Sequence, residues 1–245
     1  MSGHSKWANI KRKKEANDKA RGAVFAKLSH LITIAVAEGG GLGDPDHNFK
    51  LRLAVDKARN LNMPKDNIQR AIDKALGSDK NMIREVIYEA FASQGVALMI
   101  QATTDSPNRT VSGIKNVLER NNGKLGSQGS VSYLFQKCVA VVFDKPATAE
   151  DSVFTFASKL DAIDIDEDKA SYTVYVPFDH FGKIKEHLDG LSPQSTEVEY
   201  RPNSLIKVSD DKTAKSILQL AEALESLEDV HRVFFNLDIP ESLIG

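Results

Sequence analysis

The chain has 245 residues, of which 41% are hydrophobic and 27% charged, and its formal net charge is −2. These values are typical of a soluble globular protein with one to three domains. No hydrophobic stretch approaches the roughly 20 residues that cross a bilayer, and the basic N-terminus lacks the apolar segment of a secretory signal, so we expect neither a membrane span nor secretion. The one cysteine, Cys138, excludes an internal disulfide and agrees with a reducing cytoplasm, where we expect the protein to act.

The charge is distributed unevenly along the chain. Residues 1–27 contain eight Lys or Arg and only two acidic residues, a net charge of +6. Residues 1–75 together carry +7, whereas residues 76–245 carry −9. Such asymmetry indicates that the N-terminal part meets a polyanion while the acidic remainder stays away from it.

The basic segment also contains Trp7, the single tryptophan of the chain. Cations attract phosphates and an indole ring stacks on bases, so this combination favours a nucleic acid as partner. A solvated tail and an anionic membrane surface are the alternatives, and Trp7 is also suited to packing against the helices that follow. We expect no membrane partner, because the next helix has an apolar face committed to its own bundle. The predicted nucleic-acid-binding residues are Lys6, Trp7, Lys11, Arg12, Lys13, Lys14, Lys19, Arg21 and Lys27.

Three helices are predicted after the basic segment. Apolar residues recur at helical spacing over residues 17–38, and the glycines of Gly39–Gly43 end that helix. A second helix is expected from about residue 48, and Pro64 suits the first turn of a third. Three short helices with small loops predict a helical bundle. The Gly39–Gly43 loop is interpreted as a helix stop and hinge, or as a loop that reaches into a bound partner.

The pattern changes to strands after residue 78. Residues 85–91 and 96–102 predict two strands joined by a short hairpin loop. Ser106 and Pro107 then suit the N-cap and first turn of a helix that ends near residue 121. The glycine-rich turn that follows resembles the GXXG clamp of an RNA-binding module, although a helix cap explains it more simply.

Residues 138–201 predict the order strand, helix, strand, strand, helix, strand, which is that of a ferredoxin-like domain. Cys138 begins the first of these strands and is expected to be a buried thiol. The helices are expected at 149–160 and 179–190. Their surroundings are acidic, with 11 Asp or Glu against 5 Lys or Arg over residues 144–190, and we interpret this as a solvated face that repels nucleic acid.

A last helix at 211–228 and a strand at 230–236 match the unfinished sheet of the middle region. The predicted fold class is therefore α+β, with an N-terminal three-helix bundle and two α+β domains, the last of which is ferredoxin-like and inserted into the middle one. The predicted domains are residues 1–78, residues 79–137 with 202–245, and residues 138–201.

Enzyme signatures are missing from the sequence. It has no HExxH motif, no nucleophile elbow, no phosphate loop and no Cys/His cluster. The acidic run that starts at Asp164 opens like a calcium loop, but Lys169 stands where that loop needs glycine and Tyr175 where it needs glutamate. We therefore expect no catalytic residue, no metal, no cofactor and no small-molecule substrate.

Several long motifs resemble those of the YebC family, which includes the bacterial YebC/PmpR proteins and the mitochondrial translational activator of cytochrome oxidase. The matching segments are Gly3–Ile10, Phe25–Leu28, Gly43–Asp46, Leu51–Ala54, Asn62–Ile68, Asn108–Val111 and Gly123–Phe135. The chain departs from the family pattern at Ala23, at Ala26 and in the hairpin over residues 89–95. The resemblance implies a three-domain cytoplasmic regulator.

Two functions follow as expectations. The first is a non-enzymatic transcriptional regulator that binds DNA through the basic N-terminal region. The alternative, also implied by the resemblance, is a ribosome-associated translation factor that relieves stalling at proline-rich stretches by contacting rRNA or tRNA. Both use the basic segment, and since no recognition helix with base-reading side chains is evident, we expect contacts to the backbone of the polymer.

Overall fold

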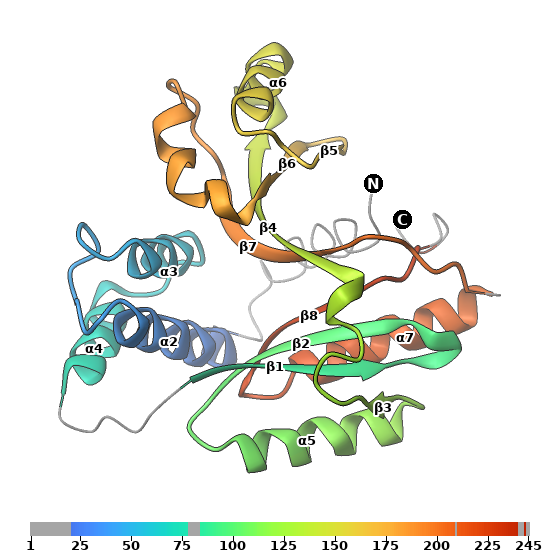
Figure 1. Ribbon diagram of the computed structural model, residues 1–245. Helices are drawn as coiled ribbons and strands as arrows, with labels where there is room; N and C mark the ends of the chain where they lie inside the picture. Colours follow the sequence, from blue (N-terminus) through green and yellow to red (C-terminus); the bar gives the residue numbers. More distant parts are fainter. Residues whose placement is uncertain (1–20, 78–83, 209, 240–242, 244–245) are drawn as a thin grey trace.

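The computed structural model describes residues 21–77, 84–208, 210–239 and 243, with side chains from residue 24 onward. It confirms the predicted fold class: helices come first, and two α+β units follow, each built on one antiparallel sheet. In Figure 1 the N-terminal helices lie on the left, the first sheet with its helices lies below, and the second sheet stands at the top. The domain boundaries at residues 78, 137 and 201 remain proposed.

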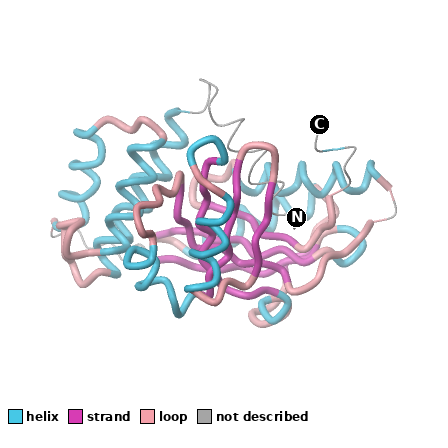
Figure 2. The backbone as a smooth tube through the Cα atoms, turned by 90° about the horizontal axis from the view of Figure 1, so that it is seen from above, coloured by secondary structure: helices cyan, strands magenta, loops and turns pink. Residues whose placement is uncertain are grey.

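The helical unit consists of α2 (Arg21–Glu38), α3 (Phe49–Asn60) and α4 (Lys65–Leu76). Apolar residues of all three helices meet and bury a small core of their own. Its fully or almost fully buried members are Leu28, Ile32, Val36, Leu51, Ala54, Val55, Ala58, Ile68, Ala71 and Ile72. Seen from above, in Figure 2, these helices stand at one end of the molecule, beside the strands.

The first sheet has the strand order β3-β1-β2-β8, and all of its pairs are antiparallel. Its strands are β1 (Arg84–Phe91), β2 (Ala97–Thr104), β3 (Lys124–Leu125) and β8 (Val230–Phe235). The helices α5 (Pro107–Arg120) and α7 (Asp211–Glu225) cover one face and enclose the largest core. The opposite face is covered in part by Val131 and Phe135, which follow β3, and by Tyr200.

The second sheet has the order β5-β6-β4-β7, which is the ferredoxin-like arrangement. Its strands are β4 (Phe135–Asp144), β5 (Asp164–Glu167), β6 (Ser171–Pro177) and β7 (Ser195–Pro202). Helix α6 (Glu150–Lys159) and the 3₁₀-helix η4 (Phe178–His187) complete the unit. The remaining 3₁₀ turns are η1 (Ser93–Gly95), η2 (Ser132–Leu134) and η3 (Lys145–Ala147).

The predicted helix at 179–190 is wrong in type and in extent. Its apolar residues Phe178, Phe181 and Ile184 recur every third position, and all three pack into the core of the second unit. A 3₁₀-helix has three residues per turn, so it alone places such a series on one line. The structure corrects two further details. Ser106 makes no side-chain cap for α5, and α7 ends at Glu225 rather than near residue 228.

Candidate nucleic-acid interface

Most of the predicted binding residues lie outside the part of the chain that the structure describes. These are Lys6, Trp7, Lys11, Arg12, Lys13, Lys14 and Lys19. Arg21 opens α2, where the backbone is described and the side chain is not. Lys27 is the one predicted residue whose side chain is described, so the set stays a prediction.

Lys27 connects two units of the fold. Its ammonium donates a hydrogen bond to the backbone carbonyl of Glu225, at the last turn of α7. The final carbonyls of a helix lack partners within the helix and carry the negative end of its dipole, so a cation is favoured there. A phosphate at Lys27 would compete with this carbonyl.

Further cations of the helical unit were not among the predicted residues. Residues 49–76 contain seven Lys or Arg against three Asp, a charge imbalance that the sequence already carried. On α4, Lys65 and Lys74 are exposed and make no ion pair with any residue that the structure describes. Arg70 is also exposed and is oriented by Asn67, whose side-chain oxygen accepts a bond of 3.0 Å. Helix α4 therefore carries three exposed cations beside two exposed acidic residues, Asp66 and Asp73.

The Gly39–Gly43 loop ends α2 as predicted, and hydrogen bonds connect it to both flanking helices. Gly40 and Gly41 have φ values of +73° and +80°, a backbone conformation that glycine adopts without strain. Asn48 donates to the carbonyl oxygens of Ala35 and Leu42, at 2.8 and 3.0 Å, and its side-chain oxygen caps α3. The loop is thus fastened between two helices.

The loop after β3 is fastened by a buried carboxylate. Glu89 is 6% exposed and accepts hydrogen bonds from the backbone N–H groups of Gly129, Val131 and Ser132, at 2.6 to 2.9 Å. Burial opposes the charged form, but these bonds outweigh it and lower the pKa of Glu89. One side chain from β1 therefore holds the end of the glycine-rich turn that follows α5.

A second buried carboxylate anchors the start of α5. Asp229 accepts bonds from the hydroxyl of Thr110 at 2.6 Å and from the guanidinium of Arg109 at 3.2 Å. These two residues belong to the motif Asn108–Val111, and Asp229 directly precedes β8. This motif therefore has a structural role, since it ties the helix to the returning strand.

Acidic residues on β7 join all three units. Glu197 forms ion pairs with Lys57 of α3, at 3.1 Å, and with Arg232 of β8, at 2.8 Å. Arg232 also lies 3.2 Å from Glu199, whose side chain is 4% exposed. Nearby, the ring of Phe49 on α3 packs edge-on against Phe181 of η4, with 4.5 Å between ring centres. The helical unit is thus positioned by ionic and aromatic contacts with the second sheet.

The predicted solvated acidic face is partly wrong. Arg201 pairs with both Asp164 and Asp166, and Asp166 is buried. The three side chains line an open cleft of about 560 Å³ beside the segment that leaves β7. Glu167 in turn pairs with Lys145 at 2.5 Å. Part of the acidic charge is therefore neutralised within the unit.

Two observations on the described residues concern metal binding and thiol chemistry. No group of three or more His, Cys, Asp or Glu side chains there could hold a metal ion. Cys138 is fully buried as predicted, and burial raises the pKa of its thiol to about 12. Among the described helices, none is both long and apolar enough to cross a membrane.

Comparison with known proteins accounts for nearly the whole chain. Residues 5–78 match the model for the TACO1/YebC protein N-terminal domain, and residues 83–237 match that for the TACO1/YebC second and third domain. The chain belongs to the TACO1/YebC family. It is 42% identical over 249 residues to a "probable transcriptional regulatory protein" of Rubrobacter xylanophilus, covering 100% of this chain and 98% of that protein.

The chain is also similar to two further proteins. A protein of Borreliella burgdorferi, also named a probable transcriptional regulatory protein, is 43% identical over 245 residues and is covered completely. The crystal structure of a conserved hypothetical protein from Aquifex aeolicus superposes with a TM-score of 0.83 at 34% identity, covering 91% of this chain and 93% of that one. The names of the Rubrobacter and Borreliella proteins support a regulator.

Proposed function

We propose that this protein is a non-enzymatic, cytoplasmic regulator of gene expression that binds DNA through its basic N-terminal region. The observation that carries the proposal is the concentration of eight cations against two acidic residues in residues 1–27. The names of the relatives support a role in transcription. Residues 49–76 of the helical unit add seven Lys or Arg against three Asp.

The binding should depend steeply on salt, because each neutralised phosphate releases counterions. With about five phosphates engaged, the slope of log K against log salt should be about −4.5 on duplex DNA and about −3.5 on single strands. A variant with Lys11, Arg12, Lys13 and Lys14 changed to glutamine should bind more weakly. Its slope on duplex DNA should be less steep by about 0.9 for each phosphate that the variant no longer neutralises.

A matched control distinguishes the effect of these four residues on binding from the effect of net charge alone. Lys183, Lys185, Lys212 and Lys215 are exposed lysines on η4 and α7, and their change to glutamine removes the same charge. This control should keep the affinity and the slope of the unchanged protein. Equal weakening in both variants, or binding that is insensitive to salt, would overturn the proposal.

The alternative partner is ribosomal RNA or tRNA. The family description supports this alternative, because it names TACO1 beside YebC. A ribosome-associated factor should sediment with ribosomes, and deletion of residues 1–16 should release it. A promoter footprint at physiological salt would instead support transcription.

A further inference from the structure

A tyrosine in the loop between β3 and β4 is unusually exposed. The side chain of Tyr133 is 71% exposed, the highest value among the large hydrophobic residues that the structure describes. Its neighbours Val131 and Phe135 are buried against the first sheet, with exposed fractions of 0% and 7%. The chain is therefore anchored on both sides of a ring that stays in solvent.

The loop that presents this ring is rigidly supported. Glu89 holds the preceding residues through three backbone N–H groups, as described above. On the other side, the side-chain amide of Asn203 donates to the carbonyl of Tyr133 at 3.1 Å, and the backbone N–H of Asn203 donates to the carbonyl of Leu134 at 2.8 Å. A preorganised aromatic ring binds a flat ligand at a smaller entropic cost than one on a loose loop.

The two segments that meet below the ring carry cations and no acidic residue. Residues 120–137 and 201–207 meet at one place, because Phe135 pairs with Pro202 and Asn203 donates to the carbonyls of Tyr133 and Leu134. Together these segments contain five cationic residues and no acidic one. Arg201 is engaged by the aspartates of β5. The other four are exposed and form no ion pair with any described residue: Arg120, Lys124, Lys137 and Lys207.

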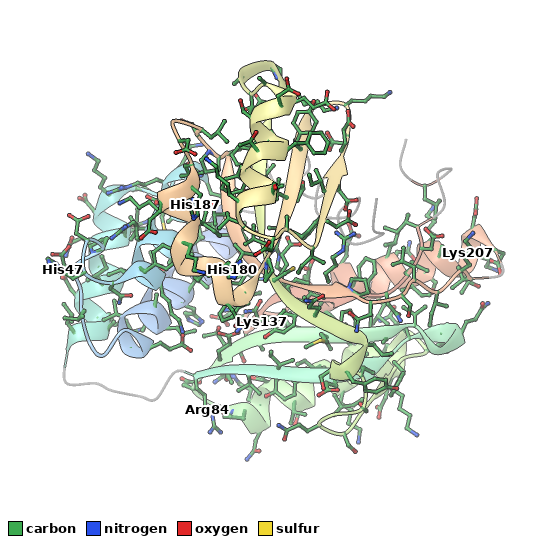
Figure 3. The ribbon with its side chains drawn as sticks, turned by 45° about the horizontal axis from the view of Figure 1, so that its top comes forward. His47, Arg84, Lys137, His180, His187 and Lys207 are labelled. Atoms are coloured by element: carbon green, nitrogen blue, oxygen red, sulfur yellow. The ribbon has the colours of Figure 1, made fainter. Side chains whose placement is uncertain are left out.

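Two of these exposed cations are labelled in Figure 3 and lie well apart. In Figure 3, Lys137 lies at the base of the ferredoxin-like domain and Lys207 lies farther out, on the segment that leads to α7. The ammonium of Lys137 is 4.0 Å from the centre of the Phe178 ring and remains exposed. Amide side chains lie on the same two segments, at Gln128, Gln136 and Asn203. Such groups pair with the edges of unpaired bases, as lysines pair with phosphates.

We propose that Tyr133 stacks on an unpaired base of a single-stranded nucleic acid, with Lys124, Lys137 and Lys207 tracking its backbone. This second contact rests on the proposed function, and it specifies the form of the polymer. Bases in a duplex are stacked inside the helix, so only a single strand offers a face to the ring. An acidic protein partner would also complement the cations, but it would not need the flat ring.

The test compares an oligothymidine about 16 nucleotides long with the duplex of the same length. Tyr133→Ala should weaken binding to the single strand about tenfold, the scale expected for one stacked base. Its affinity for the duplex should stay within about twofold, and the salt slope should not change, since stacking releases no counterion. Tyr133→Phe keeps the ring and should bind like the unchanged protein.

Phe154→Ala is the matched control. Phe154 is 52% exposed on α6, in the acidic unit, so its removal deletes an exposed ring without touching the proposed surface. This variant should bind both probes normally. Equal binding of the single strand by Tyr133→Ala and the unchanged protein, or equal weakening on the duplex, overturns the stacking proposal.

The two proposals fail in different ways. The glutamine variant of Lys11–Lys14 tests the N-terminal segment on both probes. If this variant binds both probes normally and Tyr133→Ala binds the single strand weakly, the N-terminal proposal fails and the stacking proposal stands. The reverse result removes the stacking proposal alone.

Discussion

Arg232 on β8 lies 3.2 Å from Glu199 on β7, and this pair joins the two sheets of the molecule. The same guanidinium lies 2.8 Å from Glu197, which also forms an ion pair with Lys57 of the helical unit. The side chains of Arg232 and Glu199 are 17% and 4% exposed, so water screens their interaction weakly. The relative position of the three units therefore depends on a small set of charges.

Removing the cation should destabilise the protein strongly. Arg232→Met leaves Glu199 charged and buried without this partner, and we expect a loss of about 3 kcal/mol in the free energy of unfolding. Urea unfolding followed by circular dichroism measures it. Arg59→Met is the control, because Arg59 and its partner Asp56 are both more than half exposed, and it should cost less than about 1 kcal/mol. Similar losses in the two variants would contradict the role of burial.

Glu89→Gln should loosen the loop after β3. The amide keeps one acceptor oxygen where the carboxylate offered two, and hydrogen bonds to a charged group are the stronger ones, so we expect a loss of about 2 kcal/mol at neutral pH. The urea midpoint measures this loss. Hydrogen exchange at the amides of residues 129–132 should accelerate in the variant.

The contribution of Glu89 should also depend on pH. Its folded-state pKa is lowered from the ordinary value of 4.5, so its stabilisation is complete above the unfolded-state pKa and disappears as the pH falls through the folded one. The difference in stability between the unchanged protein and Glu89→Gln should shrink on acidification below about pH 4.5. A difference that stays constant down to about pH 2 would show that the charge is irrelevant.

The thiol of Cys138 should be inert in the folded protein. It is fully buried on β4 and its pKa is about 12, so almost no thiolate is present at about pH 8. Ellman's reagent should label the native protein only as fast as it unfolds, and it should label the chain rapidly in urea. Rapid labelling of native protein would mean that this strand opens to solvent.

Gly39→Ala should disturb the junction of α2 and α3. A Cβ at position 39 would lie 2.0 Å from Nδ2 of Asn48, the residue that bonds to α2 and caps α3. We expect a loss of about 2 kcal/mol in the free energy of unfolding. Gly182→Ala is the control, since its Cβ would meet no atom within 4 Å. It should leave the melting temperature nearly unchanged.

Much of the fold was predictable from local pattern. The apolar spacing of α2, α3 and α4, the alternation of the strands and the breaks at glycine and proline all reflect forces between near neighbours in the chain. The return of the chain to the first sheet was predictable as well, because an unfinished sheet needs a strand. The type of η4 was missed, although the three-residue spacing of Phe178, Phe181 and Ile184 was visible.

Partners far apart in the sequence could not be predicted. Glu197 and Glu199 alternate with Val198 on β7, which identifies a strand with an acidic face, but nothing local shows that this face meets Arg232. Glu89 likewise gives no sign that it holds a loop some forty residues later. The exposed state of Tyr133 could not be predicted either, because Val131, Leu134 and Phe135 close to it in the sequence are apolar and suggest burial.

The placement of β8 has a consequence for biosynthesis. β2 lies between β1 and β8, and β8 is made only after the whole ferredoxin-like unit. Until the ribosome has released residues 230–235, the outer edge of β2 has no strand to satisfy its peptide groups, and an open edge invites pairing with other chains. A premature stop anywhere after β2 and before β8 would thus yield a fragment prone to aggregate, even where the inserted unit is complete.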